Sequence, residues 1–187
     1  QFNGEDDVEF PQDPEREGYE FGGWFTDRDC TAGNEFESWD DVTATTMSVY
    51  AKWTPVEYTI TYDVNGGTDV SPASVDVTYG NDIPAEPETS KTGYTFGGWT
   101  YTDAENTVYT GTTMPAYDLT ATAQWTPNTY IITYNSDEGT WAETSSTDDL
   151  QKTYVYDAAV FVPTASDVTK TGYTFDKVTL ADNSTVF

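Results

Sequence analysis

The sequence contains no histidine and only one cysteine among its 187 residues. The lone Cys30 excludes an intrachain disulfide, and no cluster of cysteine and histidine exists to hold zinc. Without histidine the chain lacks the commonest general base, and it has no Gly-x-Ser-x-Gly motif for a nucleophilic serine. These absences predict a protein that is not an enzyme and that carries no organic cofactor.

Basic residues are almost as scarce, because 7 Lys and Arg stand against 33 Asp and Glu, for a net charge of −26. Nucleic-acid binding is excluded, since it depends on Lys and Arg contacts to phosphate. No apolar run approaches the roughly 20 residues that a membrane span needs. We therefore expect no membrane insertion within this stretch, and mutual repulsion between chains that favours solubility.

Aromatic residues, in contrast, make up 16% of the chain, far more than an acidic disordered segment contains. The chain must therefore fold. It begins at Gln1 rather than Met, and we expect it to be a fragment or a processed product.

The aromatic residues recur in one phrase, written GYEFGGWF at 18–25, GYTFGGWT at 93–100 and GYTFDKVT at 172–179. Two further landmarks recur 72 residues apart, Trp53 with Trp125 and Tyr58 with Tyr130. A fixed period of this length indicates a tandem repeat. We predict a partial module over residues 1–54, a complete module over 58–126 and a second partial module over 130–187. The first lacks its opening strand and the third lacks its closing strand.

Within one repeat the pattern is that of β-strands. YTITYDV at 58–64 and residues 74–79 alternate with period two, Asn65-Gly66-Gly67 is a turn signal, and 119–125 reads as a closing strand. No segment has a long apolar period of 3.6 residues. The fold class is therefore predicted as mostly β, a small mixed or antiparallel sheet in each module. The joins WTPVEY and WTPNTY each contain proline, which favours a stiff connector.

The recurring phrase is interpreted as a structural motif that supplies turn residues and core side chains to each module. Its first glycine suits an unusual φ or a close backbone contact, its aromatic residues supply buried area to a small core, and Gly-Gly breaks the strand register as a bulge would. In the third copy Asp176-Lys177-Val178 replaces Gly-Gly-Trp, which puts the bulge there in doubt. The residues of this structural motif are Gly18, Tyr19, Phe21, Trp24, Gly93, Tyr94, Phe96, Gly97, Gly98, Trp99, Gly172, Tyr173 and Phe175.

The order YTITYDVNGG, VTYG, GYTFGGWT and a closing L-or-V-x-A-x-W resembles the Listeria–Bacteroides repeat, the B-repeat of internalin-type surface proteins. The resemblance implies α+β, β-grasp-like modules strung in an elongated tandem array. It also implies an extracellular place, at the cell surface or attached to the cell wall, and a non-catalytic role.

Two kinds of ligand contact stay open beside this reading. Trp39 and Trp141 lie outside the repeated columns among polar residues, and an exposed aromatic ring beside carboxylates suits a glycan. Calcium is the second ligand, although none of the acidic clusters has the spacing of a known calcium loop. These clusters are Glu5-Asp6-Asp7, Asp27 with Asp29, Asp40-Asp41 and Asp148-Asp149.

The sequence thus predicts a stalk, a spacer or a weak multivalent adhesin, whose partners are neighbouring repeats of the same chain and host or neighbouring-cell surface proteins or glycans. One alternative is a glycan- or host-protein-binding module that uses the two loop tryptophans. A further alternative is a subunit or linker of a surface filament that assembles by strand addition.

Overall fold

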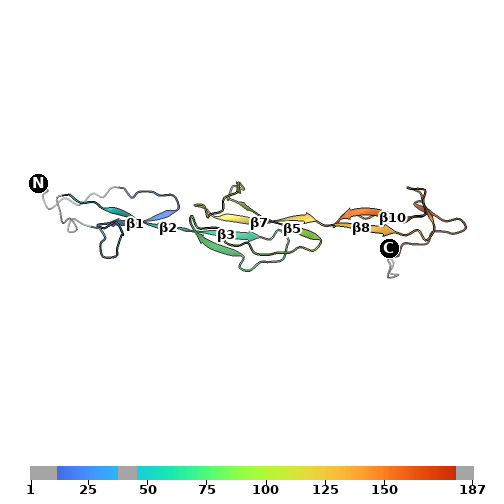
Figure 1. Ribbon diagram of the computed structural model, residues 1–187, viewed down its shortest axis with the longest axis horizontal. Helices are drawn as coiled ribbons and strands as arrows, with labels where there is room; N and C mark the ends of the chain where they lie inside the picture. Colours follow the sequence, from blue (N-terminus) through green and yellow to red (C-terminus); the bar gives the residue numbers. More distant parts are fainter. Residues whose placement is uncertain (1–11, 38–45, 180–187) are drawn as a thin grey trace. The chain divides into compact units, whose positions relative to one another are not determined.

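A computed structural model of the chain describes residues 12–37 and 46–179 (Figure 1). The described residues are mostly β, and no helix occurs among them. They fold as two compact units, one formed by residues up to 89 with 98–124, the other by residues 90–97 with those from 125 onward. The strands are β1 (Tyr19–Phe25), β2 (Tyr50–Pro55), β3 (Glu57–Asp63), β4 (Ser74–Thr78), β5 (Tyr94–Thr102), β6 (Val108–Tyr109), β7 (Leu119–Pro127), β8 (Thr129–Tyr134), β9 (Thr140–Trp141), β10 (Leu150–Val155) and β11 (Val168–Thr169).

The first repeat contains an antiparallel pair of strands, β1 and β2. Their register shifts between Phe21 and Trp24, where the two glycines of the phrase lie, and Gly23 has a φ of +100°. The bulge predicted from Gly-Gly is therefore confirmed in this copy. It brings the Trp24 ring to 5.5 Å from that of Phe21, whose other neighbour is Trp53 at 5.6 Å.

The middle repeat is a five-stranded mixed sheet in the order β4-β3-β7-β5-β6. Strands β3 and β7 run parallel at its centre, with Ile60 opposite Leu119 and Tyr62 opposite Ala121, and β4 is antiparallel to β3 (Figure 1). The mixed sheet agrees with the sequence prediction.

The core of the middle repeat follows from the alternation along β7. Leu119, Ala121 and Ala123 are at most 2% exposed, while the threonines between them face the other side. Small alanines leave room for large rings, and Tyr62 packs edge-to-face on Trp99 at 5.1 Å. The Trp99 indole N–H donates to the Pro87 carbonyl at 3.1 Å, so this buried ring has its hydrogen bond.

The third repeat contains two strand pairs, β8 with β10 and β9 with β11, all antiparallel. Its core is made of Tyr134, Trp141, Leu150 and Val168, and Phe175 of the phrase packs against it. Residues 172–178 form no strand. Since Gly-Gly-Trp is replaced there, the third copy lacks the aromatic residue that β5 buries in the middle repeat.

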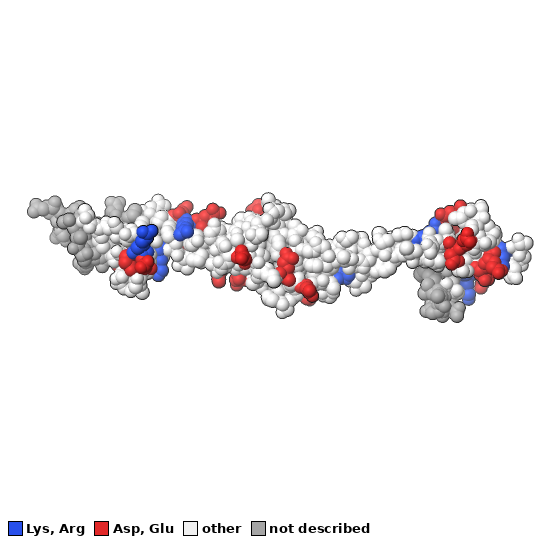
Figure 2. Space-filling view, in the orientation of Figure 1, with Lys and Arg blue, Asp and Glu red and all other residues white. Residues whose placement is uncertain are grey.

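Charged side chains of both signs lie on the surface, and Figure 2 shows basic groups beside acidic ones in the first and third repeats. In the third repeat Lys152 meets Glu143 at 2.6 Å, and Lys170 lies 3.6 Å from Asp137 and 3.5 Å from Glu138. Exposed pairs of this kind contribute about 0–1 kcal/mol each. The fold therefore depends on its aromatic packing rather than on ion pairs.

Alkaline pH is expected to destabilise the protein through two tyrosines. Burial raises the pKa of Tyr101, with the Glu86 carboxylate adding to the shift, and burial also raises the pKa of Tyr134, whose hydroxyl donates to the Phe161 carbonyl at 2.6 Å. Below pH about 10 both states keep these protons. Above it the unfolded chain releases them first, so the free energy of unfolding falls as pH rises.

Urea unfolding at pH 8 and pH 11 measures this loss. We expect Tyr101→Phe and Tyr134→Phe each to lose less free energy of unfolding between the two pH values than the parent chain. Tyr173→Phe, at a ring that is 73% exposed, is the control and should lose as much as the parent chain. An equal loss in all three variants would contradict the assignment.

Candidate functional site: the junctions between repeats

Two of the acidic clusters, Asp27 with Asp29 and Asp148-Asp149, lie within the described ranges. No group of three or more His, Cys, Asp or Glu residues is placed there to hold a metal ion. Asp27 instead accepts a hydrogen bond from the Thr31 N–H at 3.0 Å, and Asp148 accepts one from the Ser146 hydroxyl at 2.9 Å. The clusters at 5–7 and 40–41 lie outside the described residues. Residues 12–37 and 46–179 also contain no helix long and apolar enough to cross a membrane.

Trp141 is a core residue rather than a surface ring. Its side chain is 2% exposed, its indole packs edge-to-face on Tyr134 at 6.4 Å, and its backbone pairs with Val168 across β9 and β11. The premise of an exposed aromatic face is therefore wrong at this position. Trp39, the other predicted contact, lies outside the described residues.

The residues of the phrase take part in a junction between consecutive repeats. The closing strand of one repeat is separated from the opening strand of the next by one residue, Val56 between β2 and β3 and Asn128 between β7 and β8. The two prolines of the predicted stiff joins, Pro55 and Pro127, are the last residues of β2 and β7. A repeat thus begins one residue after its predecessor ends.

At the first junction Gly18 of the first repeat meets Tyr79 of the second. The Val56 N–H donates to the Gly18 carbonyl at 2.9 Å, and the Tyr79 N–H donates to the Val56 carbonyl at 2.8 Å. The Tyr79 ring then lies over Gly18, where any Cβ would overlap it, and stands edge-to-face with Tyr19 at 5.6 Å. The Arg16 guanidinium covers the Tyr19 ring at 3.7 Å from its centroid.

The second junction repeats this geometry with different residues. The Asn128 N–H donates to the Gly93 carbonyl, and the Tyr156 N–H donates to the Asn128 carbonyl, both at 2.8 Å. The Tyr156 ring covers Gly93 so closely that a Cβ there would overlap it, and it meets Tyr94 edge-to-face at 5.5 Å. Lys91 takes the place of the arginine, with its ammonium 4.7 Å from the Tyr94 centroid.

The third copy of the phrase forms half of the same arrangement. Lys170 lies 4.8 Å from the Tyr173 centroid, and the Tyr173 N–H donates to the Lys170 carbonyl at 3.1 Å, as in the other two copies. Gly172 has a φ of +84°, close to the +73° of Gly18 and the +79° of Gly93. Yet no atom of the described chain lies within 4 Å of where its Cβ would stand. Among the described residues, no ring covers Gly172 as Tyr79 covers Gly18.

Sequence reasoning found the glycines and tyrosines of the phrase but missed their partners. A basic residue stands two positions before each of the three glycines, as Arg16, Lys91 and Lys170, although the whole chain has only 7 basic residues. The capping rings, Tyr79 and Tyr156, are the third residues of VTYG at 77–80 and of YVYD at 154–157. The recurrence of a basic residue at the same position of each repeat, in a chain with so few of them, could have pointed to the junction.

Replacement of a junction glycine should destabilise the chain beyond the cost of its backbone conformation. Gly93→Ala forces both a left-handed alanine and a clash with the Tyr156 ring, whereas Gly172→Ala forces only the left-handed alanine. The conformational cost is about 1–2 kcal/mol at either site. In urea melts we expect Gly93→Ala to lower the free energy of unfolding more than Gly172→Ala does. Equal losses in the two variants would show that the contact with the Tyr156 ring contributes nothing.

Comparison with known proteins agrees with this repeat architecture. The family model of the Listeria–Bacteroides repeat domain matches three times, at residues 1–52, 58–124 and 130–178. A protein of Evansella cellulosilytica, provisionally named as a membrane protein, is 36% identical over 88% of this chain and 24% of its own length. A second protein of that organism, provisionally named as a glycine-rich membrane protein, is 37% identical over 69% of this chain and 15% of its own length.

Internalin H of Listeria monocytogenes is 32% identical over 65% of the chain and 22% of its own length. The chain thus spans less than a quarter of the length of each of these relatives. No solved structure matches it. The three matches of the family model together cover most of the sequence, and the chain belongs to the Listeria–Bacteroides repeat domain family.

Proposed function

We propose that this chain is a non-catalytic spacer of a bacterial cell-surface protein, in which β-grasp-like modules follow one another as a tandem array. The observation that carries the proposal is the junction. Each link is one residue long and makes one backbone hydrogen bond to the repeat on either side, and a tyrosine of the following repeat packs on a glycine of the preceding one.

A spacer needs links that resist bending, and these junctions have the physical means. Flexible linkers are several residues long and rich in glycine and serine. Val56 and Asn128 are instead single residues between two strands, and the backbone N–H and C=O groups of each are both hydrogen-bonded. An edge-to-face ring pair contributes about 0.5–1.5 kcal/mol and an exposed cation–π contact about 0.5–1 kcal/mol. Bending a junction would break several such contacts at once.

Two further observations support a surface spacer. The names of the relatives refer to membrane proteins and an internalin, which supports a place at the cell surface. The net charge of −26 produces repulsion along the chain, and this favours extended over collapsed arrangements of modules.

Small-angle X-ray scattering of matched variants tests the proposal. Tyr94 and Tyr173 occupy the same column of the phrase, but Tyr94 contacts Tyr156 in a closed junction and Tyr173 is exposed. Tyr94→Ala should broaden the distance distribution and reduce the mean dimension, because it loosens the second junction. Tyr173→Ala should scatter like the parent chain. Identical scattering of all three folded proteins would contradict a stiff junction.

A spacer that works through geometry needs no ligand of its own. We therefore expect no saturable binding in a screen of glycans and host matrix proteins with the whole chain. Binding that survives at physiological salt and saturates with concentration would favour an adhesin instead, and Trp39→Ala would then test the remaining predicted contact.

A further inference from the structure

The two central strands of the middle repeat are also the strands by which the chain enters and leaves it. Strand β3 begins one residue after β2 ends, and β7 ends one residue before β8 begins. Only Val56 and Asn128 separate these strands from the neighbouring repeats. Tension applied along the chain therefore enters the middle repeat at the start of β3 and leaves it at the end of β7.

These two strands are direct neighbours in the sheet, and they run parallel. Their ladder joins Ile60–Asp63 to Leu119–Thr122, and we call it the β3–β7 ladder. Because the strands are parallel, the start of β3 and the end of β7 lie at opposite ends of this ladder. Tension then pulls the strands past each other along their own direction, and the evenly spaced hydrogen bonds of the ladder share the load. Bonds that are pulled from one end of a ladder instead break one after another.

Side chains continue the β3–β7 ladder beyond both of its ends. The Thr59 backbone N–H donates to the Asp118 carboxylate at 2.8 Å, just before the first backbone pair. The Asn65 side-chain amide donates to the Ala123 carbonyl at 3.2 Å, just after the last one. The two strands are thus joined over a longer stretch than the backbone pairing alone provides.

The core fixes the register of the β3–β7 ladder. Ile60 and Ala121 are fully buried, Leu119 is 2% exposed, and Tyr62 packs on Trp99. A shift of one strand by one residue would turn its buried side chains to the outer face of the sheet. Sliding the strands apart therefore requires the loss of the core packing together with the hydrogen bonds.

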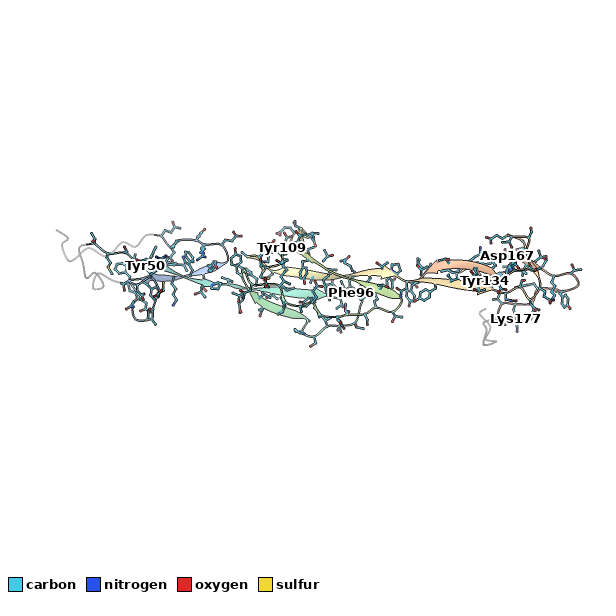
Figure 3. The ribbon with its side chains drawn as sticks, viewed as in Figure 1. Tyr50, Phe96, Tyr109, Tyr134, Asp167 and Lys177 are labelled. Atoms are coloured by element: carbon cyan, nitrogen blue, oxygen red, sulfur yellow. The ribbon has the colours of Figure 1, made fainter. Side chains whose placement is uncertain are left out.

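The other strands of the sheet lie outside the path of the tension. Strand β4 pairs with the far edge of β3, while β5 and β6, which carry Phe96 and Tyr109 in Figure 3, follow on the far side of β7. The chain connects these strands to β3 and β7 only through segments inside the repeat. The β3–β7 ladder therefore sets the force at which the repeat unfolds.

We propose that the middle repeat bears tension along the chain, with the β3–β7 ladder as the element that resists it. Forced unfolding is governed by the unfolding rate, so resistance does not require a large free energy of unfolding. The inference deepens the spacer function and rests on it for the origin of the load, because a spacer between a cell and an attached target is pulled from both ends. Scattering tests the stiffness of the junctions, whereas pulling tests the ladder, so the two proposals fail separately.

Single-molecule pulling of the whole chain tests the inference through the direction of the load. In a Cys30→Ser background, Glu57→Cys with Thr126→Cys places handles at opposite ends of the ladder and loads it in shear. Glu57→Cys with Tyr117→Cys places both handles at the same end and peels the strands apart, and all three handle positions are exposed. We expect a several-fold higher unfolding force in shear, with a gain in length of about 200 Å when the whole repeat unfolds.

Two carboxylates that bind Thr59 provide a matched pair of variants. Asp118→Ala removes a bond that continues the β3–β7 ladder, whereas Asp76→Ala removes the bond of the Thr59 hydroxyl to the Asp76 carboxylate, 2.7 Å long and between β3 and β4. In shear, only Asp118→Ala should lower the unfolding force, with circular dichroism confirming that both variants fold. Equal forces in shear and in peeling, or equal losses in the two variants, would overturn the proposal.

Discussion

The packing of a tyrosine ring on a glycine backbone is the contact on which both junctions of this protein depend. At Gly18 and Gly93 the ring of the next repeat occupies the space where a side chain would begin. The same glycine adopts a left-handed backbone and offers its carbonyl to the single linking residue. Both requirements are met only by a residue without Cβ, so one position controls the turn, the link and the aromatic contact.

The rest of the phrase connects this junction to the core of its own repeat. The tyrosine after the glycine contacts the incoming ring, while the aromatic residues beyond it pack inward, Phe96 on Trp125 at 5.3 Å and Trp99 on Tyr62 at 5.1 Å. The glycine pair between them shifts the strand register, as the break between Phe21 and Trp24 shows. Eight residues thus link the interior of one module to the first strands of the next, and the phrase recurs because every module needs both functions.

The core of the middle repeat depends on strands from its two ends. Its central strands β3 and β7 are parallel and come from opposite ends of the repeat, so neither half alone can bury Ile60 and Leu119. The core of this repeat therefore closes only when its last long strand pairs with its first.

Much of this organisation follows from the sequence alone. Period-two alternation, turn signals and the 72-residue spacing determine the strands, the mostly β class and the recurrence of one module, because these depend on local side-chain direction and on identity between distant segments. The glycine pair in the phrase likewise determines the bulge in β1.

Only the tertiary structure decided which residues meet. Trp141 stands among polar neighbours in the sequence, yet the pairing of β9 with β11 buries it, since burial depends on the strand laid over a residue and not on the residues beside it. The contacts of Tyr79 with Gly18 and of Tyr156 with Gly93 join residues about 60 positions apart. No local pattern specifies such a pair, because it forms only once the single-residue link has placed one repeat directly against the next.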